Sequence, residues 1–252
     1  MQAEILGTDE TGCLMGGALT DDVMVPGLRR VGRASLQQRV YDELTKSLMH
    51  GAFAAGQVLR MQAVADTLGV SVMPVREALG RLVTERALEV MPNRSTRVPL
   101  ITEARLDDLA RARCLIEGEL VRIAVPQMDV DKLELLRHQT EACEAAFARL
   151  DEEHATETSV LNHDFHFTIY RAAGSEVLLP IVRSLWMQSS PCVRASAIIY
   201  GRNPSLTAVH HHWALIDALE ARDAEAAVAA LHSDITQSFD LIRTDMRKAR
   251  DE

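Results

Sequence analysis

Apolar residues recur at intervals of three and four along most of the chain from residue 35 onward, which is the spacing of one buried helix face. Around residue 69 this pattern predicts two short helices separated by a turn. The segment 61–68 ends at Gly69, a residue type that often terminates helices. In the next helix Ser71 can act as the cap, and Pro74 falls in the first turn, where its missing N–H costs little. Apolar residues then return at helical spacing at Val75, Ala78, Leu79 and Leu82.

Two helices joined by a short turn form a helix-turn-helix, whose second helix enters the major groove of DNA. A helix over 35–50 precedes the pair, and a short loop lies around 56–59. Two β-type runs, 88–91 and 96–99, follow as a hairpin and complete a winged helix-turn-helix. The expected DNA contacts lie near the second helix and at the tip of the wing: Gln62, Ser71, Val72, Met73, Arg76, Arg81, Asn93 and Arg94.

The apolar pattern stays helical from Thr102 to near the end of the chain. We expect the first of these helices to end before Pro126, and Pro191 to separate two others. The connections are short, which favours antiparallel neighbours in an all-helical bundle. The fold class is therefore mainly α, with a small β-hairpin as the wing. The expected helices span 102–125, 130–150, 156–173, 177–189, 192–200, 206–221 and 224–248.

The chain is expected to contain three parts. Residues 1–34 hold six glycines and one proline without a sustained period, so they are expected to form a flexible tail. Residues 35–99 form the DNA-binding domain, and residues 100–252 form the bundle, which we expect to bind an effector and to dimerise. Three arginines close the tail: Arg29, Arg30 and Arg33. They could contact phosphates, although a solvated tail is the simpler interpretation.

The net charge of −9 is distributed unevenly. Residues 35–100 carry eight Lys and Arg against six Asp and Glu, whereas residues 101–252 carry 16 basic against 25 acidic residues. A slightly basic module attached to an acidic one fits a nucleic-acid reader joined to a second function. The positive excess is small, so charge alone does not establish DNA binding.

The four cysteines are far apart and form no C-x-x-C pair, so we expect reduced thiols. No run of about 18 apolar residues predicts a membrane span. The N-terminus is acidic and lacks a basic region before an apolar block, unlike a signal peptide. A cytoplasmic protein is therefore expected.

Residues 69–79 read GVSVMPVREAL. This block resembles a characteristic part of the DNA-binding domain of the GntR family of bacterial transcription regulators, and the resemblance extends over about 35–99. Family members often have basic residues at the positions of Val72 and Gln62, which are uncharged here. The resemblance therefore implies the usual docking on DNA but not the usual operator sequence.

Residues 104–245 resemble the all-helical FCD effector domain of the FadR-type branch of that family. The matching features are Arg113 with Glu117, the sequence NxxFH at 162–166, the sequence AGS at 173–175, and His212 followed by Ala218, Leu219 and Asp223. The match is weaker per residue than in the DNA-binding domain, but the order and spacing agree.

Candidate metal ligands lie in this second domain, which holds eight of the nine histidines. Asn162 and His166 share a helix face, and His212 lies in an inward-facing apolar stripe. FCD domains often bind a divalent metal through Asp or Asn, a His four residues on, and two later histidines. The resemblance thus places Zn, Mn or Ni on Asn162, His166, His212 and Asp234. His232, two residues before Asp234, would face another direction. Spacing alone would make His166 and His212 hydrogen-bonded core histidines.

Arg113 stands at an apolar, periodic position, and arginine is rarely buried without a partner. Two interpretations remain open: an ion pair with Glu117 within the helix, or a clamp on the carboxylate of a small organic acid. The resemblance supports the second, because related regulators often sense sugar acids, lactate or short dicarboxylates. Three residues line this pocket or pack in the core: Trp186, Met187 and Tyr200. Four others are expected at the rim or in solvent: His163, Asp164, His210 and His211.

These observations predict a homodimeric bacterial transcription regulator that binds a near-palindromic operator in double-stranded DNA and senses a small organic acid, with a divalent metal at the effector site. A metal sensor, in which the ion itself is the signal, is the first alternative. A metal-dependent hydrolase or lyase is the second, but the chain has no H-E-x-x-H motif or nucleophile elbow. We therefore do not expect an enzyme.

Overall fold

The computed structural model describes residues 36–149, 155–202 and 209–251. The predicted tail over 1–34 and its three arginines lie outside the described residues. Residues 34–252 form one compact unit. Within the described ranges no helix is both long and apolar enough to cross a membrane.

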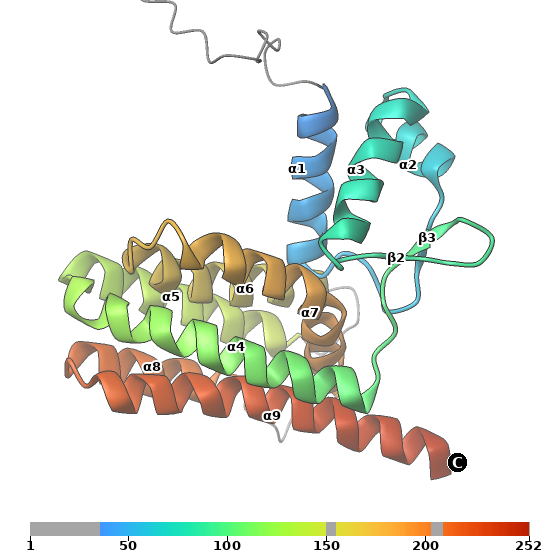
Figure 1. Cartoon of the computed structure of the whole chain (residues 1–252). Helices are drawn as coiled ribbons and strands as arrows, with labels where there is room; N and C mark the ends of the chain where they lie inside the picture. The colour runs from blue at the N-terminus through green and yellow to red at the C-terminus, as the bar shows by residue number, and fades with distance from the viewer. Residues whose placement is uncertain (1–35, 150–154, 203–208, 252) are drawn as a thin grey trace, which may run out of the picture. The chain divides into compact units, whose positions relative to one another are not determined.

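The helix-turn-helix forms as the apolar pattern predicts. It comprises α1 (Leu36–Met49), α2 (Met61–Leu68) and α3 (Val72–Thr84), which Figure 1 shows in blue to blue-green. Gly69 ends α2 in the left-handed conformation, with φ of 64°, which glycine adopts without steric cost. Ser71 occupies the N-cap position of α3, but its side chain makes no capping hydrogen bond, so the expected side-chain cap is wrong.

The wing is a three-stranded antiparallel sheet rather than a hairpin alone. β2 (Glu89–Val90) and β3 (Thr96–Arg97) form the predicted hairpin, and the turn between them places Arg94 at a φ of 62°. The segment expected as a loop around 56–59 contributes a third strand, β1 (Val58–Leu59), which pairs with β3. The strand order is β1-β3-β2. Unlike the hairpin strands, β1 pairs with a strand far along the chain (Val58 with Arg97), so no adjacent turn and second run mark it in the sequence.

The second half of the chain is a bundle of long helices. Thr102 and Asp129 cap two of them, each accepting a hydrogen bond from a backbone N–H three residues on. Pro126 lies in a short 3-10 turn, η1 (Val125–Gln127), directly after the first helix. The helices are α4 (Glu103–Ala124), α5 (Val130–Phe147), α6 (Ala155–Ala172), α7 (Leu178–Arg202), α8 (His210–Glu220) and α9 (Ala224–Asp251).

The expected break at Pro191 is wrong, because α7 runs through it as one helix from Leu178 to Arg202. A proline inside a helix leaves the carbonyl four residues earlier without its N–H partner. Here that carbonyl belongs to Met187, and the Ser190 hydroxyl donates to it at 3.0 Å. The side chain before the proline thus replaces part of the missing backbone bonding, and the helix continues.

Two other helix ends differ from the expected ones. The sixth helix is expected from 206, but α8 begins at His210, and residues 203–208 lie outside the described residues. The last helix, α9, continues to Asp251 rather than ending near 248. Such differences of a few residues are usual for helix ends, where the periodic signal is weakest.

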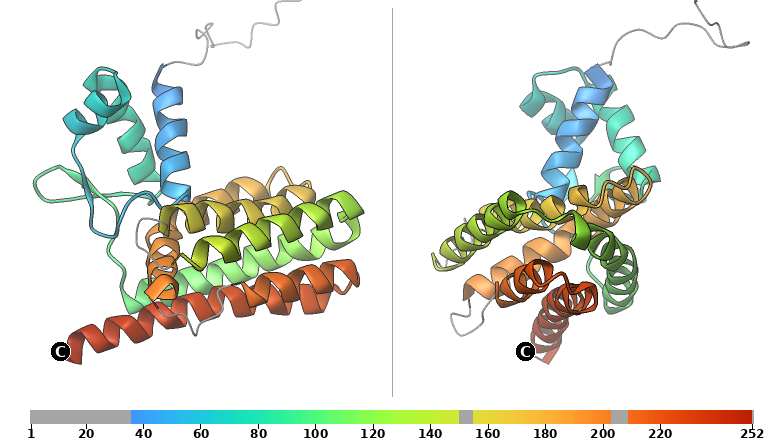
Figure 2. Two further views of the ribbon diagram at one scale, coloured as in Figure 1. Left: turned by 180° about the vertical axis from the view of Figure 1, so that it is seen from behind. Right: turned by 90° about the vertical axis from the view of Figure 1, so that its left-hand side faces the viewer.

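Within the bundle, α4 packs along α9, α8 along α9 and α5 along α6. Both views in Figure 2 agree with this side-by-side arrangement, and the right-hand view shows several helices nearly end on. The core between them is aromatic and aliphatic, with Phe165, Trp186, Phe239 and Leu120 fully buried. Polar residues that reach this core come from α4, α6, α7, α8 and α9, and they form the inner site.

Candidate functional sites: the recognition helix and an inner polar cavity

α3 presents an exposed side next to its buried stripe. Arg76 is exposed, and it makes no hydrogen bond or ion pair within the described ranges of the chain. Met73, on the first turn, is 55% exposed although it is apolar. Ser71 is exposed, and Val72 is partly buried against the core. A free arginine on the outer face of the second helix is available for base edges or phosphates.

Arg81, by contrast, is held by the protein itself. Its Nε donates to Glu85 at 3.0 Å, and its Nη1 donates to Gln38 of α1 at 3.2 Å. The guanidinium also lies 3.5 Å from the centre of the Tyr41 ring, whose hydroxyl donates to Glu85 at 2.6 Å. The structure therefore ties this arginine to the packing of α3 against α1, whereas the sequence suggested only a DNA contact.

The remaining expected DNA contacts lie at the surface. The Gln62 amide donates to Asp66 at 2.8 Å on α2. At the wing tip Asn93 accepts from the Ser95 backbone N–H at 3.0 Å, and Arg94 is exposed beside it. Asn93 thus shapes the turn, and Arg94 is the residue that the turn presents.

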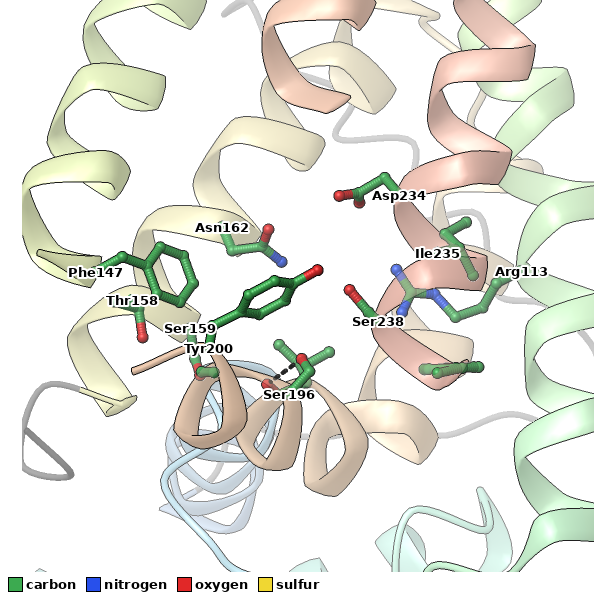
Figure 3. Close-up of a pocket in the computed structure, with 13 residues that line it drawn as sticks. Arg113, Phe147, Thr158, Ser159, Asn162, Ser196, Tyr200, Asp234, Ile235 and Ser238 are labelled. Carbon is green, nitrogen blue, oxygen red and sulfur yellow. Dashed lines mark hydrogen bonds between the residues drawn. The ribbon is translucent and has the colours of Figure 1, made fainter. Parts of the chain in front are cut away.

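The four expected metal ligands meet inside the bundle. His166 Nε2 lies 3.2 Å from Asp234 Oδ2, and His212 Nε2 lies 3.1 Å from Asn162 Oδ1. One ligand atom from each of His166, His212 and Asp234 lies within 4.8 Å of the others. Figure 3 shows Asn162 and Asp234 facing a common space from α6 and α9. His232 is excluded from this group, because its Nε2 bonds to the carbonyl of Cys114 at 2.9 Å.

The electrostatics of this cluster suit a cation. Burial lowers the pKa of His212 to about 3, so the ring is neutral at pH 7, and its Nδ1 has no partner among the described residues. Burial alone would raise the pKa of Asp234, but the hydrogen bond and charge of His166 lower it to about 2. Two imidazoles, one amide oxygen and one carboxylate form a donor set that divalent ions of the Zn and Mn type accept.

A second layer of hydrogen bonds orients the cluster. The Tyr170 hydroxyl lies 3.3 Å from His166 Nδ1 and donates to Glu117 at 2.5 Å. Such outer partners fix the tautomer and the direction of a metal-binding histidine. The His212 ring stacks on Phe165 with a centroid distance of 3.9 Å, which holds it in place.

Arg113 and Glu117 form the ion pair that the sequence left as one of two interpretations. The guanidinium uses Nε and Nη2 to bond both carboxylate oxygens of Glu117, at 2.6 and 3.1 Å. It also lies 4.5 Å from the centre of the Trp186 ring. Burial alone would lower the pKa of Arg113, but Glu117 raises it, so the side chain stays charged. Arg113 nevertheless lines the same cavity as Asn162 and Asp234.

The cavity between these residues has a volume of about 30 Å³. Figure 3 shows the Tyr200 ring between Asn162 and Ser238, with its hydroxyl toward the centre. The space admits an ion or a water molecule rather than an organic acid, because one water already needs about 10–15 Å³. Sequence reasoning did not identify four other lining residues, which carry no spacing signal of their own: Ser159, Thr158, Ser196 and Ser238.

The expectation that His163 faces outward is wrong, because the residue is only 5% exposed. Asp164 and His210 are at least partly exposed, as expected, and His211 is half-buried. α6 is buried on more than one side, with Phe165, His166 and Phe167 adjacent in sequence and all inside. That unbroken aromatic run was the available signal that one periodic face would not describe this helix.

Two family models match the chain. Residues 36–98 match the family described as bacterial regulatory proteins, gntR family, and residues 108–237 match the FCD domain family. The chain is 29% identical over 220 residues to the HTH-type transcriptional regulator McbR of Escherichia coli K12, covering 86% of this chain and 97% of that protein. It is 31% identical over 152 residues to the HTH-type transcriptional repressor GlaR of the same strain, covering 58% of this chain and 67% of that protein.

A solved structure of E. coli McbR/YncC is similar in fold. It has a TM-score of 0.75 and 27% sequence identity, and the match covers 84% of this chain and 99% of that chain. A putative GntR regulator from Rhodococcus sp. RHA1 has a TM-score of 0.67 at 21% identity, which supports the fold alone. The matched families and the relatives named here are transcription regulators and not enzymes.

Proposed function

Because the chain belongs to the GntR family of bacterial regulatory proteins and carries an FCD domain, we propose that it is a ligand-responsive, homodimeric regulator acting in the cytoplasm. Residues 35–99 serve as the DNA-binding domain, and residues 100–252 serve as the effector-binding and dimerisation domain. One α3 from each copy reads one half of a near-palindromic operator, since a two-fold protein matches a two-fold DNA site. The inner cavity holds a divalent metal together with a small organic acid as effector.

One observation supports the ligand proposal: the donor groups of Asn162, His166, His212 and Asp234 meet beside Arg113. When bound there, a divalent ion would supply positive charge that attracts a carboxylate. Arg113 adds a second cationic group at the cavity wall. Glu117 takes two of its five N–H donors, so three remain for an incoming anion.

Binding of an organic acid requires the cavity to open, because about 30 Å³ does not contain one. Phe147 of α5 and Tyr200 of α7 line the cavity, so a shift of either side chain would enlarge it. α7 also reaches the end of α1, where Arg194 Nη1 donates to the carbonyl of Gly51 at 3.1 Å. A ligand that favours one position of α7 would therefore shift the arrangement of the DNA-binding domain and its operator affinity.

The small cavity also favours one alternative, a metal sensor in which the ion is the signal. The two functions differ in what changes operator affinity. In the sensor, removal of the metal alone alters DNA binding, whereas in the proposed regulator the organic acid alters it in the presence of constant metal.

The test is a thermal-shift screen of the full chain with lactate, gluconate and succinate, each with Zn²⁺, with Mn²⁺ and with EDTA. Metal should raise the melting temperature, since an ion at 100 times its dissociation constant adds about 2.7 kcal/mol. At least one acid should raise it further, and only when metal is present. The active acid is then added to an operator-binding assay.

The variant Asp234→Asn removes a ligand charge with little change in shape, and Asp217→Asn, at an exposed position on α8, is its matched control. We expect the affinity for the metal ion to fall about tenfold or more in Asp234→Asn. The affinity of Asp217→Asn should equal that of the natural protein. The proposed site would be contradicted if both variants bound the metal with equal affinity. It would also be contradicted if the organic acid bound equally well with and without EDTA.

A further inference from the structure

A second group of metal-binding side chains lies away from the inner cavity. His50 follows α1, and His163 and Asp164 lie on α6, all within the same compact unit. One ligand atom from each lies within 4.8 Å of the others. Ligands bound at about 2.0–2.2 Å from one ion can be no more than about 4.4 Å apart, so a small inward movement would complete such a sphere.

The geometry of this group fits joint coordination. His163 Nδ1 lies 3.0 Å from Asp164 Oδ1, a separation that two ligands of one ion also show. The rings of His50 and His163 have centroids 5.0 Å apart, so a nitrogen of each can face a shared ion. The His163 ring is fixed by stacking on Phe167 with a centroid distance of 4.2 Å.

The group is placed so that an ion can reach it. His163 is 5% exposed, and its Nδ1 is the ring nitrogen that lies beside Asp164. His50 is half-buried and faces a pocket that His163 and Asp164 also line, so an ion can enter from solvent.

We propose that His50, His163 and Asp164 bind a second divalent cation, which links the end of α1 to α6. Three donors leave one or more positions for water, as in open zinc sites. Lys46, Arg171 and Arg183 line the same pocket, while Asp42 adds one negative charge. The three cations oppose the ion, so this site is weaker than the inner one.

The position of the site gives it a consequence for DNA binding. α6 carries Asn162 toward the inner cavity and His163 and Asp164 toward the end of α1. An ion held by His50 and α6 would restrain the DNA-binding domain against the bundle. If this ion changes the affinity for the operator by some factor, the operator must change the affinity for the ion by the same factor.

The experiment measures metal stoichiometry on the full chain after EDTA treatment, using Co²⁺ absorption and isothermal titration with Zn²⁺. The variants are His50→Ala for this site, His212→Ala for the inner site, and His138→Ala as the control. His138 is a matched control because its side chain is 71% exposed on α5. His50→Ala is preferred to a change at His163, because His50 is half-buried and its loss does not open the core.

We expect two ions per chain in the natural protein and in His138→Ala, and one in His50→Ala, with the weaker binding step lost. His212→Ala should retain the step that His50→Ala loses. The natural protein could instead bind only one ion, and His50→Ala could abolish that binding. This result would support the site at His50 and contradict the inner metal site. If His50→Ala leaves stoichiometry and affinity unchanged, or if the pocket responds to inorganic phosphate and not to metal, the proposal is overturned.

Discussion

Arg113 and Glu117, one helical turn apart on α4, share two hydrogen bonds while both side chains are at most 5% exposed. A pair this deeply buried gains little net stability from its charges, because both lose their hydration. Its value lies in holding a guanidinium at the wall of the cavity that Asn162 and Asp234 also line. The same pair makes the bundle sensitive to loss of either partner.

Glu117→Gln should therefore destabilise the protein strongly. The change leaves the Arg113 charge buried without its counterion, which typically costs about 3–5 kcal/mol. The free energy of unfolding in urea measures this. Glu119→Gln is the control on the same helix, where the Glu119 side chain is 50% exposed in its pair with Arg122. The control should lose less than about 1 kcal/mol of unfolding free energy. A loss in Glu117→Gln as small as that of the control would show that the buried pair does not matter to the fold.

Ser190→Ala should destabilise the protein through α7. The Ser190 hydroxyl is the group that bonds the Met187 carbonyl left by Pro191, and the residue is 1% exposed. An unsatisfied buried carbonyl costs about 1–3 kcal/mol. Urea unfolding is again the measurement, and Ser233→Ala, an exposed position on α9, is the control. A variant as stable as the natural protein would mean that the proline is accommodated in another way.

The metal-free protein should lose stability as the pH falls below about 6.5. Burial lowers the pKa of His163 to about 4 and that of His212 to about 3, although the hydrogen bond to Asp164 partly opposes the first shift. The unfolded chain then binds more protons than the folded one between these values and about 6.5, so stability rises with pH in this range. Each group contributes up to about 1.4 kcal/mol per pH unit.

Urea unfolding in EDTA at pH 7 and pH 5.5 checks this dependence. His212→Gln should reduce the difference between the two pH values, whereas His138→Ala, at an exposed position, should leave it unchanged. The prediction fails if the natural protein is equally stable at both pH values or more stable at the lower one.

Arg81→Ala should lower stability, whereas Arg76→Ala should not. Arg81 bonds Glu85 and Gln38 and lies over Tyr41, which together are worth about 0.5–1.5 kcal/mol at a half-exposed site. Arg76 has no such contact in the described part of the chain. Thermal unfolding of both variants separates the two roles, and equal melting temperatures would contradict the assignment of Arg81 to the packing of α3 on α1.

The sequence was sufficient for most of the helices and for the helix-turn-helix, because these depend on local signals. Gly69 and the returning apolar positions fixed the turn between α2 and α3 within a residue or two. The same signals gave a wrong prediction at Pro191, where a break between two helices was expected. A proline normally ends a helix, and the hydroxyl of Ser190 that compensates for it gives no periodic signal.

The inner site was reached through a family resemblance and not through spacing. Asn162 and His166 share a face by local geometry, but the meeting of His166 with Asp234 depends on how α6 packs against α9. The burial of His163 and its approach to His50 depend on contacts between residues more than 100 positions apart. Tertiary packing of this kind leaves no trace in the period of one helix.

The central claim is that α3 reads DNA, and Arg76 tests it most directly. A duplex enriched from random sequence by the full chain is labelled, and its binding is followed by fluorescence anisotropy at fixed salt. The comparison is between the natural protein, Arg76→Ala, and Arg111→Ala, which removes an exposed arginine of α4. We predict that Arg76→Ala weakens operator binding by about 1–3 kcal/mol, while Arg111→Ala binds like the natural protein. Unchanged affinity in Arg76→Ala would contradict the claim.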